Sequence, residues 1–420
     1  MKIRCPVCKK IAKNNEKPFT TINPETLYIY RNNNETSTNY YKCQFCNSLI
    51  SDFFDENIYL KNSKHDNQSI SESLHNPFIR HYIECGAGID FMLTPIISTI
   101  DIKNINSYLE VGCGFGFNLD FLKFHNKKIN LKGMEAADYG SVGASSLELP
   151  ISNEYLVSKN KKNEKYDLIY SSEVIEHVSD PENFLRLQLE YLNKGGIIAF
   201  TTPNAEYVVP GAKDAITTSV LSPGFHAFVM SPKSIRMILS KFKIRNYKIF
   251  KENERLIVFL SYDFDVKKIE LVKNRSNYLD YLKYRSNIFL SGPLGLGFNF
   301  RLFKELVNTG AYNSALNSLD TIENILFNEY NIDIRNINID SLKSCKNISS
   351  IINSGFSIIG PLLYFKGFLN YVSGDHNTSS TLLNLSKEWI HKFDIVAKAI
   401  NQEGEGLISA IDFHMGALSI

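Results

Sequence analysis

The sequence lacks a strong charge excess and any long apolar segment. Its 420 residues carry 46 Lys and Arg against 44 Asp and Glu, a formal net charge of +2. A chain this close to neutrality has no large positive electrostatic potential for binding nucleic acid phosphates, which disfavours a protein that works mainly on nucleic acid. No apolar run approaches the roughly 20 residues of a membrane span, and the first residues have no apolar signal core. We therefore expect a cytoplasmic protein of two or three domains.

Disulfides are also disfavoured, because the chain has no secretory signal. Four of its seven cysteines nevertheless form two Cys-x-x-Cys pairs, Cys5 with Cys8 and Cys43 with Cys46. Two such pairs are typical of a tetrahedral zinc site. The residues between the pairs are too polar to fold unaided, so Zn²⁺ would supply folding energy. We predict a structural zinc in a module spanning 1–60; four reduced thiols without metal are the alternative.

A glycine-rich turn follows a short apolar segment in the middle of the chain. Tyr108–Val111 is predicted to be a buried strand, and Gly112, Gly114 and Gly116 follow it directly. A helical apolar pattern begins at Phe117. Strand, glycine turn and helix form the layout of a nucleotide-binding loop, where the backbone approaches a ligand closely. Glu110 strengthens this interpretation, since a charge at a strand end is costly unless it faces a site.

Strands and helices alternate from residue 105 onward, which predicts an α/β fold with a parallel, doubly covered sheet. A second strand ends at Glu135, about 20 residues beyond the turn, where an acid is expected to bond the ribose of an adenosyl ligand. Further predicted strands are 151–157, 166–170, 197–202, 244–251 and 255–262, with helices over 139–147, from Asp180 to Asn193, and from Ser231 to about Phe242.

Four segments resemble class I S-adenosylmethionine-dependent methyltransferases: 109–116, 133–135, 166–178 and 192–204. The resemblance implies a Rossmann-like core over 105–263 that binds S-adenosyl-L-methionine. It also implies that the glycine turn lies against the methionine part of the cofactor, that Glu110 holds its amino group and that Glu135 holds its ribose. The candidate cofactor-binding residues are Glu110, Gly112, Cys113, Gly114, Gly116, Glu135, Ser171 and Ser172.

The segment after the fourth strand carries the candidate chemistry. Glu173, Glu176 and His177 stand at relative positions 0, +3 and +4, which share one face of a helix. With His226 they could bind a divalent metal, Mg²⁺ or Mn²⁺, that positions a hydroxyl and lowers its pKa. The element resembles small-RNA terminal-ribose 2′-O-methyltransferases and ubiquinone-pathway O-methyltransferases. Glu176, His177 and His226 are the candidate catalytic residues. A metal-free histidine base and a merely pocket-lining role remain alternatives.

The regions on either side of the predicted core carry fewer local signals. Residues 61–104 are predicted to be a linker followed by one or two helices. Residues 264–420 have few strand signals and are predicted to form a helical domain, with the glycine-rich segment 291–297 as a flexible loop between helices. That segment lacks the Gly-Lys-Ser/Thr of a phosphate loop. Two imperfect helical-hairpin patterns, near 306–319 and 365–383, would suit self-association or a protein partner, although an ordinary helical core is favoured.

The whole arrangement resembles methyltransferases of bacterial surface-polysaccharide and other glycan pathways. We therefore expect an O-methyltransferase that acts on a sugar hydroxyl of a bacterial surface-glycan precursor. A sugar C-methyltransferase, an RNA 2′-O-methyltransferase and a non-catalytic scaffold with a partner-binding helical tail are the alternatives. The C-methyltransferases usually end in a second α/β domain, and RNA binding is disfavoured by the near-neutral charge.

Overall fold

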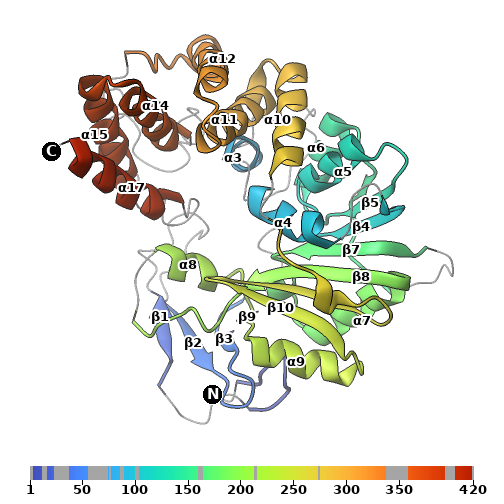
Figure 1. The fold of residues 1–420 in the computed structure, drawn as a ribbon. Coiled ribbons are helices and arrows are strands. Elements are labelled where there is room, and N and C mark those ends of the chain that lie inside the picture. The colour runs from blue at the N-terminus through green and yellow to red at the C-terminus, as the bar shows by residue number, and fades with distance from the viewer. Residues whose placement is uncertain are drawn as a thin grey trace. The chain divides into compact units, whose positions relative to one another are not determined.

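The computed structural model describes residues 3–11, 17–22, 37–54, 74, 77–85, 89–99, 104–158, 164–211, 215–272, 275–336, 358–392 and 403–418 (Figure 1). The chain forms two compact units. The first contains the N-terminal strands and Ile89–Lys273, and the second contains helix α3 (Pro77–Cys85) and Asn274–Ile420. The unit boundaries therefore separate α3 from α4 (Ile89–Thr99), which the sequence placed together in one segment, 61–104.

A seven-stranded sheet organises the first unit, with strand order β10-β11-β8-β7-β4-β5-β6. Strands β4, β5, β6, β7 and β8 pair in parallel, and β11 pairs antiparallel with both β8 and β10. The chain order reverses between β4 and β7, so the carboxyl ends of these two strands border the crevice where open α/β sheets bind ligands. The predicted α/β class is confirmed. The strands are β4 (Ser107–Val111), β5 (Asn130–Met134), β6 (Ile151–Ser152), β7 (Tyr166–Ser172), β8 (Leu192–Pro203), β10 (Asn246–Glu252) and β11 (Arg255–Ser261).

The helices of this unit begin where local signals predict. Asp180 accepts hydrogen bonds from the N–H groups of Glu182 and Asn183 at the start of α7, and Ser231 caps α9. The predicted strand over 151–157 is shorter in the structure, because β6 pairs only with Gly133 and Met134 at the end of β5. The helices are α4, α5 (Phe117–His125), α6 (Asp138–Leu147), α7 (Pro181–Tyr191), α8 (Ala215–Leu221), α9 (Pro232–Lys241) and the 3-10 turns η3 (Ile175–His177) and η4 (Val266–Lys268).

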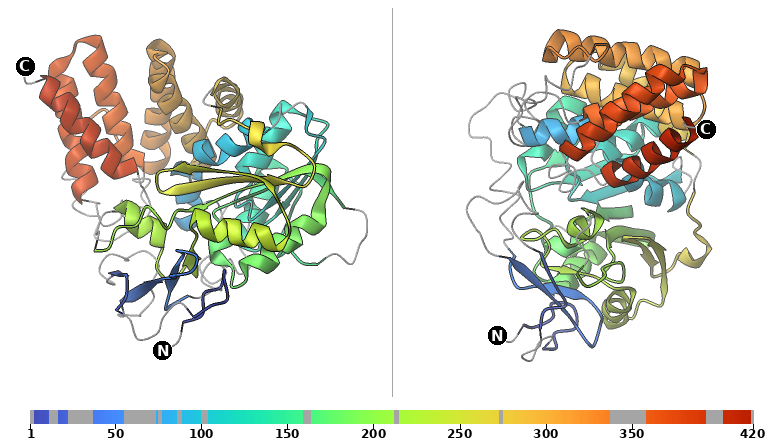
Figure 2. Two further views of the ribbon diagram at one scale, coloured as in Figure 1. Left: turned by 60° about the horizontal axis from the view of Figure 1, so that its bottom comes forward. Right: turned by 90° about the vertical axis from the view of Figure 1, so that its left-hand side faces the viewer.

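The N-terminal strands form a second sheet in the same unit. Its order is β1 (Thr20–Ile22), β2 (Thr38–Lys42), β3 (Leu49–Ser51) and β9 (Phe228–Val229), and each described pair is antiparallel. The last of these strands comes from a much later part of the chain, so the sheet joins the N-terminal residues to the region that precedes α9 (Figure 2). Its buried face packs together Tyr40, Leu49, Val220, Leu221 and Val229. The 1–60 segment thus shares a core with the rest of the unit.

The second unit is helical, as predicted for the C-terminal region. Helices α11 and α12 form one hairpin and α14 and α15 another, with left-handed glycines, Gly310 and Gly374, in the turns. Among the described residues, no helix combines the length and apolar character needed to cross a membrane. The helices are α3, α10 (Ser276–Ile288), α11 (Gly292–Asn308), α12 (Tyr312–Tyr330), α14 (Ile359–Ser373), α15 (His376–Lys392) and α17 (Glu403–Leu418).

The prediction of a flexible loop over 291–297 is wrong, because Gly292–Gly297 forms the first turns of α11. Pro293 lies in the first turn, where its missing N–H costs nothing. Gly297 serves packing rather than flexibility, since a Cβ there would come within 2.3 Å of the carbonyl oxygen of Ile83 in α3. The guanidinium of Arg301, one turn later, donates to the same carbonyl at 2.8 Å. Close helix contact therefore explains the glycine.

Gly297→Ala is expected to destabilise the helical unit by about 1–3 kcal/mol, the usual cost of overpacking a rigid contact. Gly416→Ala is the matched control, because no atom lies within 4 Å of a Cβ built on that helical glycine, and it should be neutral or slightly stabilising. Urea denaturation followed by far-ultraviolet circular dichroism measures both. Equal midpoints for the two variants would refute the packing explanation.

Candidate active site and metal centres

The glycine turn lies at the carboxyl end of β4 in an unusual backbone conformation. Gly112, Gly114 and Gly116 have φ of 69°, 55° and 89°, the left-handed region that favours glycine. The N–H groups of Gly112 and Cys113 both donate to the carbonyl of Met134 at the end of β5. A Cβ on Gly112 would come within 2.5 Å of the Val174 side chain. The turn is therefore packed directly against the segment that carries Glu173 to His177.

Glu110 lies buried beneath this turn, with 2% of its surface exposed. Asn118 in α5 donates to its Oε1 at 2.8 Å, and Oε2 has no hydrogen-bond partner among the described residues. Burial raises the pKa of the Glu110 carboxyl to about 8. A cationic group placed beside Oε2 would stabilise the charged carboxylate and satisfy the orphaned oxygen. Asn118 was not predicted as a site residue, although its position two residues after Gly116, the last glycine of the turn, could have indicated it.

Glu135 follows β5 and reaches back to the turn. Its two carboxyl oxygens accept from the N–H groups of Gly114 and Ala137, each at 2.9 Å. Burial raises its pKa, and these backbone donors act in the opposite direction. A carboxylate oxygen has two lone pairs, so each oxygen keeps one available for a ligand hydroxyl. Glu110 and Glu135 thus lie on either side of the glycine turn.

The other predicted cofactor residues are buried within the unit. Cys113 is buried in the turn itself, and burial raises the pKa of its thiol. At the end of β7, the Ser172 hydroxyl hydrogen-bonds to the hydroxyl of Thr201 at 2.8 Å, and the Ser171 hydroxyl accepts from Gln188 at 3.4 Å. Both hydroxyls are thus engaged by neighbouring elements of the sheet and α7.

Glu176, His177 and His226 come together as a cluster in which Glu176 and His226 are buried and His177 is half-buried. One ligand atom from each lies within 4.8 Å of the others. The Nε2 atoms of His177 and His226 lie 3.8 and 3.9 Å from Glu176 Oε1, and the two imidazoles meet edge to face. Thr202 donates to Glu176 Oε2 at 3.0 Å, whereas Oε1 has no hydrogen-bond partner among the described residues. An orphaned buried carboxylate oxygen facing two imidazoles is a donor set that fits a metal ion.

Backbone carbonyls orient both imidazoles. His177 Nδ1 contacts the carbonyl of Phe225 at 2.8 Å, and His226 Nδ1 contacts that of Val220 at 2.9 Å. Burial lowers the pKa of His177 to about 4 and that of His226 well below its ordinary value. Both rings are therefore neutral at pH 7, with the proton on Nδ1 and the lone pair on Nε2. Fixing the tautomer through the other ring nitrogen is the usual support of a metal-binding histidine.

Glu173 lies outside this cluster, contrary to the shared helix face expected from its spacing. Its φ of 54° turns the chain before the 3-10 helix begins at Ile175, so 173–177 is not one α-helix. Its carboxylate instead lies 4.0 Å from the guanidinium of Arg255. The charge on Glu173 still reaches Glu176, where it adds to burial in raising the pKa of that carboxyl.

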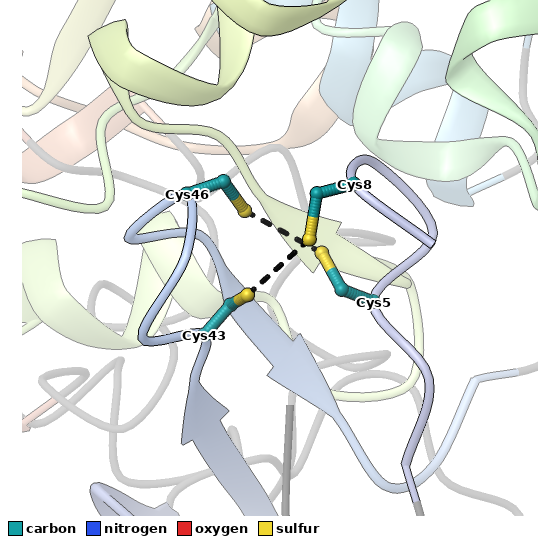
Figure 3. A group of neighbouring side chains, drawn as sticks. All are labelled: Cys5, Cys8, Cys43 and Cys46. Atoms are coloured by element: carbon teal, nitrogen blue, oxygen red, sulfur yellow. Dashed lines mark hydrogen bonds between the residues drawn. The ribbon is translucent and has the colours of Figure 1, made fainter. Parts of the chain in front are cut away.

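The four paired cysteines converge as the sequence predicts for a metal site (Figure 3). The sulfur atoms of Cys5 and Cys46 are 3.5 Å apart, as are those of Cys8 and Cys43. These separations are too long for disulfides, and all four sulfurs lie within 4.8 Å of one another. Hydrogen bonding from Cys5 lowers the pKa of the Cys46 thiol to about 5, while burial raises that of Cys43 to about 11.

The backbone of the two Cys-x-x-Cys turns follows one pattern. Lys9 N–H donates to the Cys5 carbonyl and Asn47 N–H to the Cys43 carbonyl. Lys9 and Asn47 are both left-handed, with φ of 59° and 62°. Two matching turns that present four thiols to one point fit a tetrahedral Zn²⁺ with no open position.

The fold and the glycine turn with its flanking acids define a nucleotide-cofactor-binding α/β enzyme domain. Residues 78–247 match the family described as "Methyltransferase domain", so this part of the chain is similar to methyltransferase domains. Among curated proteins, the chain is 30% identical over 149 residues to a ubiquinone biosynthesis O-methyltransferase of Pelagibacter ubique (strain HTCC1062). That match covers 31% of this chain and 54% of the relative, so the chain spans about half of the relative's length.

Two solved structures show weaker likenesses. An O-methyltransferase family protein from Burkholderia thailandensis is 9% identical, covering 46% of this chain and 63% of that one, with a TM-score of 0.37. Human N-acetylserotonin methyltransferase in complex with SAM is 11% identical, covering 49% and 62%, with a TM-score of 0.36. Because these scores are low, the assignment of the fold rests on the strand order and the family match.

The purified full-length chain is expected to contain one equivalent of zinc by elemental mass spectrometry. Cys46→Ser should lose that zinc, because it removes one of the four thiols that would bind the ion. Cys113→Ser is the control: it removes a buried thiol from the glycine turn and should leave the zinc in place. Unchanged zinc in the Cys46→Ser variant would rule out the four-cysteine site.

Proposed function

We propose that the chain is an S-adenosylmethionine-dependent O-methyltransferase with a metal-assisted active site. The observation that carries the proposal is the cluster of Glu176, His177 and His226, the first two of which follow β7. The glycine turn lies directly against the segment that carries Glu176 and His177, since a Cβ built on Gly112 would come within 2.5 Å of the Val174 side chain. The O-methyltransferase name of the Pelagibacter relative supports the same chemistry.

The glycine turn and its two acids would hold the cofactor. Gly112, Cys113, Gly114 and Gly116 offer close backbone approach to its methionine part. Oε2 of Glu110 suits the cofactor's amino group, because an ammonium would restore the charge that burial suppresses. Glu135, already oriented by two backbone N–H groups, would accept from the ribose hydroxyls. Ser171 and Ser172 at the end of β7 complete the proposed cofactor-binding set.

Glu176, His177 and His226 would hold the divalent ion. With Glu173 outside the cluster, the donor set is two imidazoles and one carboxylate, which favours Mn²⁺ over Mg²⁺. Such an ion supplies Lewis acidity that lowers the pKa of a hydroxyl. The protein's part is to hold the acceptor oxygen in line with the methyl group and to exclude water around the cluster. Without an ion, the neutral Nε2 of either histidine could instead accept the proton of the hydroxyl.

The acceptor we favour is a vicinal diol on a sugar of a bacterial surface-glycan precursor, since three protein ligands leave coordination positions for two neighbouring oxygens. The helical second unit argues against the sugar C-methyltransferase alternative, whose usual C-terminal part is a second α/β domain. The net charge of +2 gives no support to an RNA substrate. The orphaned oxygens of Glu110 and Glu176 argue against a non-catalytic scaffold.

Glu176→Gln is expected to weaken Mn²⁺ binding at least tenfold and to lower the methyl-transfer rate by about 10²-fold or more. Glu173→Gln is the matched control, and should change Mn²⁺ affinity far less because its carboxylate lies beside Arg255 instead. Mn²⁺ binding is measured by electron paramagnetic resonance, and transfer with radiolabelled cofactor on diol-bearing nucleotide sugars. Equal losses in the two variants, or no Mn²⁺ binding by the wild type, would contradict the metal assignment.

Cofactor binding is expected to release a proton. Glu110, with its pKa raised to about 8, is protonated in the free protein at neutral pH. A bound ammonium lowers that pKa, so affinity for S-adenosylhomocysteine should rise from about pH 6 to about pH 8 and then level off. Calorimetry in buffers of different ionisation enthalpy measures the released proton.

Glu110→Gln should bind without this proton release and with weaker affinity. Glu252→Gln, which alters an exposed acid on β10, is the control and should behave as the wild type does. If the wild type binds S-adenosylhomocysteine with no proton release and no dependence on pH, Glu110 does not hold the amino group.

A further inference from the structure

We propose that the four-cysteine module is the positioning element of the active site, acting through the segment 220–231 that carries His226. The cysteines lie far from His226 in the sequence, and the proposed function gives them no role in catalysis. The catalytic meaning of this inference rests on the proposed function, but the structural coupling itself does not.

The first connection runs through the shared sheet. Strand β3 of the module pairs with β9, with Leu49 opposite Val229 and Ile50 opposite Phe228. Next to this pairing, Ser51 N–H donates to the carbonyl of Ala227 at 3.2 Å. The N–H of Ala227 donates in turn to the carbonyl of Glu176 at 2.9 Å. Ala227, adjacent to His226, therefore links the module to the backbone of a proposed metal ligand.

The second and third connections hold the two ends of the segment. The buried hydroxyl of Tyr40 in β2 donates to the carbonyl of Leu221 at 2.9 Å. The neighbouring carbonyl, of Val220, is the one that fixes the His226 ring. At the other end, the Ser231 hydroxyl donates to the carbonyl of Cys46, itself one of the four cysteines.

Other hydrogen bonds also support the segment: Ala205 N–H donates to the Met230 carbonyl at 2.8 Å, and the N–H groups of Phe225 and His226 donate to the Ser222 carbonyl at 2.9 and 3.1 Å. The Met230 bond holds the segment after β9, whereas the Ser222 bonds lie within the segment and do not tie it to another element. The strands β2 and β3 are five and three residues long, and such short strands are marginal without further support. The second cysteine pair lies in the turn between them, so a metal held there would fix the hairpin on which His226 depends.

The test reads the histidine tautomers of the full chain by long-range ¹H–¹⁵N correlation spectroscopy, with His226→Gln and His177→Gln for assignment. In the wild type, both rings should show the Nδ1–H tautomer. Two variants challenge the coupling: Cys8→Ser, which removes a half-buried thiol of the metal site, and Tyr40→Phe, which removes the hydroxyl that bonds to Leu221. Thr21→Val is the control, since its hydroxyl bonds only within the module, to Asn39.

Cys8→Ser and Tyr40→Phe should broaden or shift the His226 signals towards mixed tautomers, while Thr21→Val leaves them unchanged. The dissociation constant for Mn²⁺ should rise about tenfold in Cys8→Ser, with S-adenosylhomocysteine affinity altered less than about twofold, because the glycine turn makes none of these contacts. Unchanged His226 signals in both folded variants would overturn the inference. Absence of Mn²⁺ binding in the wild type would instead count against the proposed function, and the tautomer result would still decide the coupling.

Discussion

The orientation of two buried imidazoles by backbone carbonyls is the constraint on which the candidate active site depends. A buried neutral histidine binds a metal or accepts a proton only if its tautomer and ring angle are fixed. Here the fixing groups are the carbonyls of Val220 and Phe225, in the stretch from the last residues of α8 to the turn after it. The contacts that fix this stretch therefore also fix the orientation of the His177 and His226 imidazoles. In this chain the N-terminal sheet does so from one side and the end of β8 from the other.

The two halves of the site differ in how they achieve order. The glycine turn is held locally, by hydrogen bonds to the end of β5 and by the positive φ angles that glycine alone adopts cheaply. The Glu176, His177 and His226 cluster is assembled from two distant segments, and its carboxyl and imidazole groups carry strongly shifted pKa values because burial penalises their charges. A dication would reverse that penalty for Glu176. The free-energy cost of burying the Glu176 carboxylate is therefore an indication that this site binds a cation.

Local signals in the sequence predicted most of the fold and much of the site. Asp180-Pro181 and Ser231-Pro232 start helices because their side chains and fixed φ satisfy the first turn. Glu110 and Glu135 follow from their places at strand ends. The sequence could not reveal two features: Glu173 leaves the shared face because its own φ of 54° turns the chain, and Gly297 is a glycine within a helix because the carbonyl of Ile83 leaves no room for a Cβ. The pairing of β3 with β9 joins segments too far apart for any periodicity to predict.

The central claim is that Glu176, His177 and His226 hold a divalent ion next to the cofactor. Anomalous X-ray diffraction from crystals of the full chain grown with Mn²⁺ and S-adenosylhomocysteine tests it directly. An anomalous peak is expected in contact with Glu176 Oε1 and both Nε2 atoms, with the ligand's amino group beside Glu110. A structure with S-adenosylhomocysteine bound and no anomalous density at that cluster would contradict it.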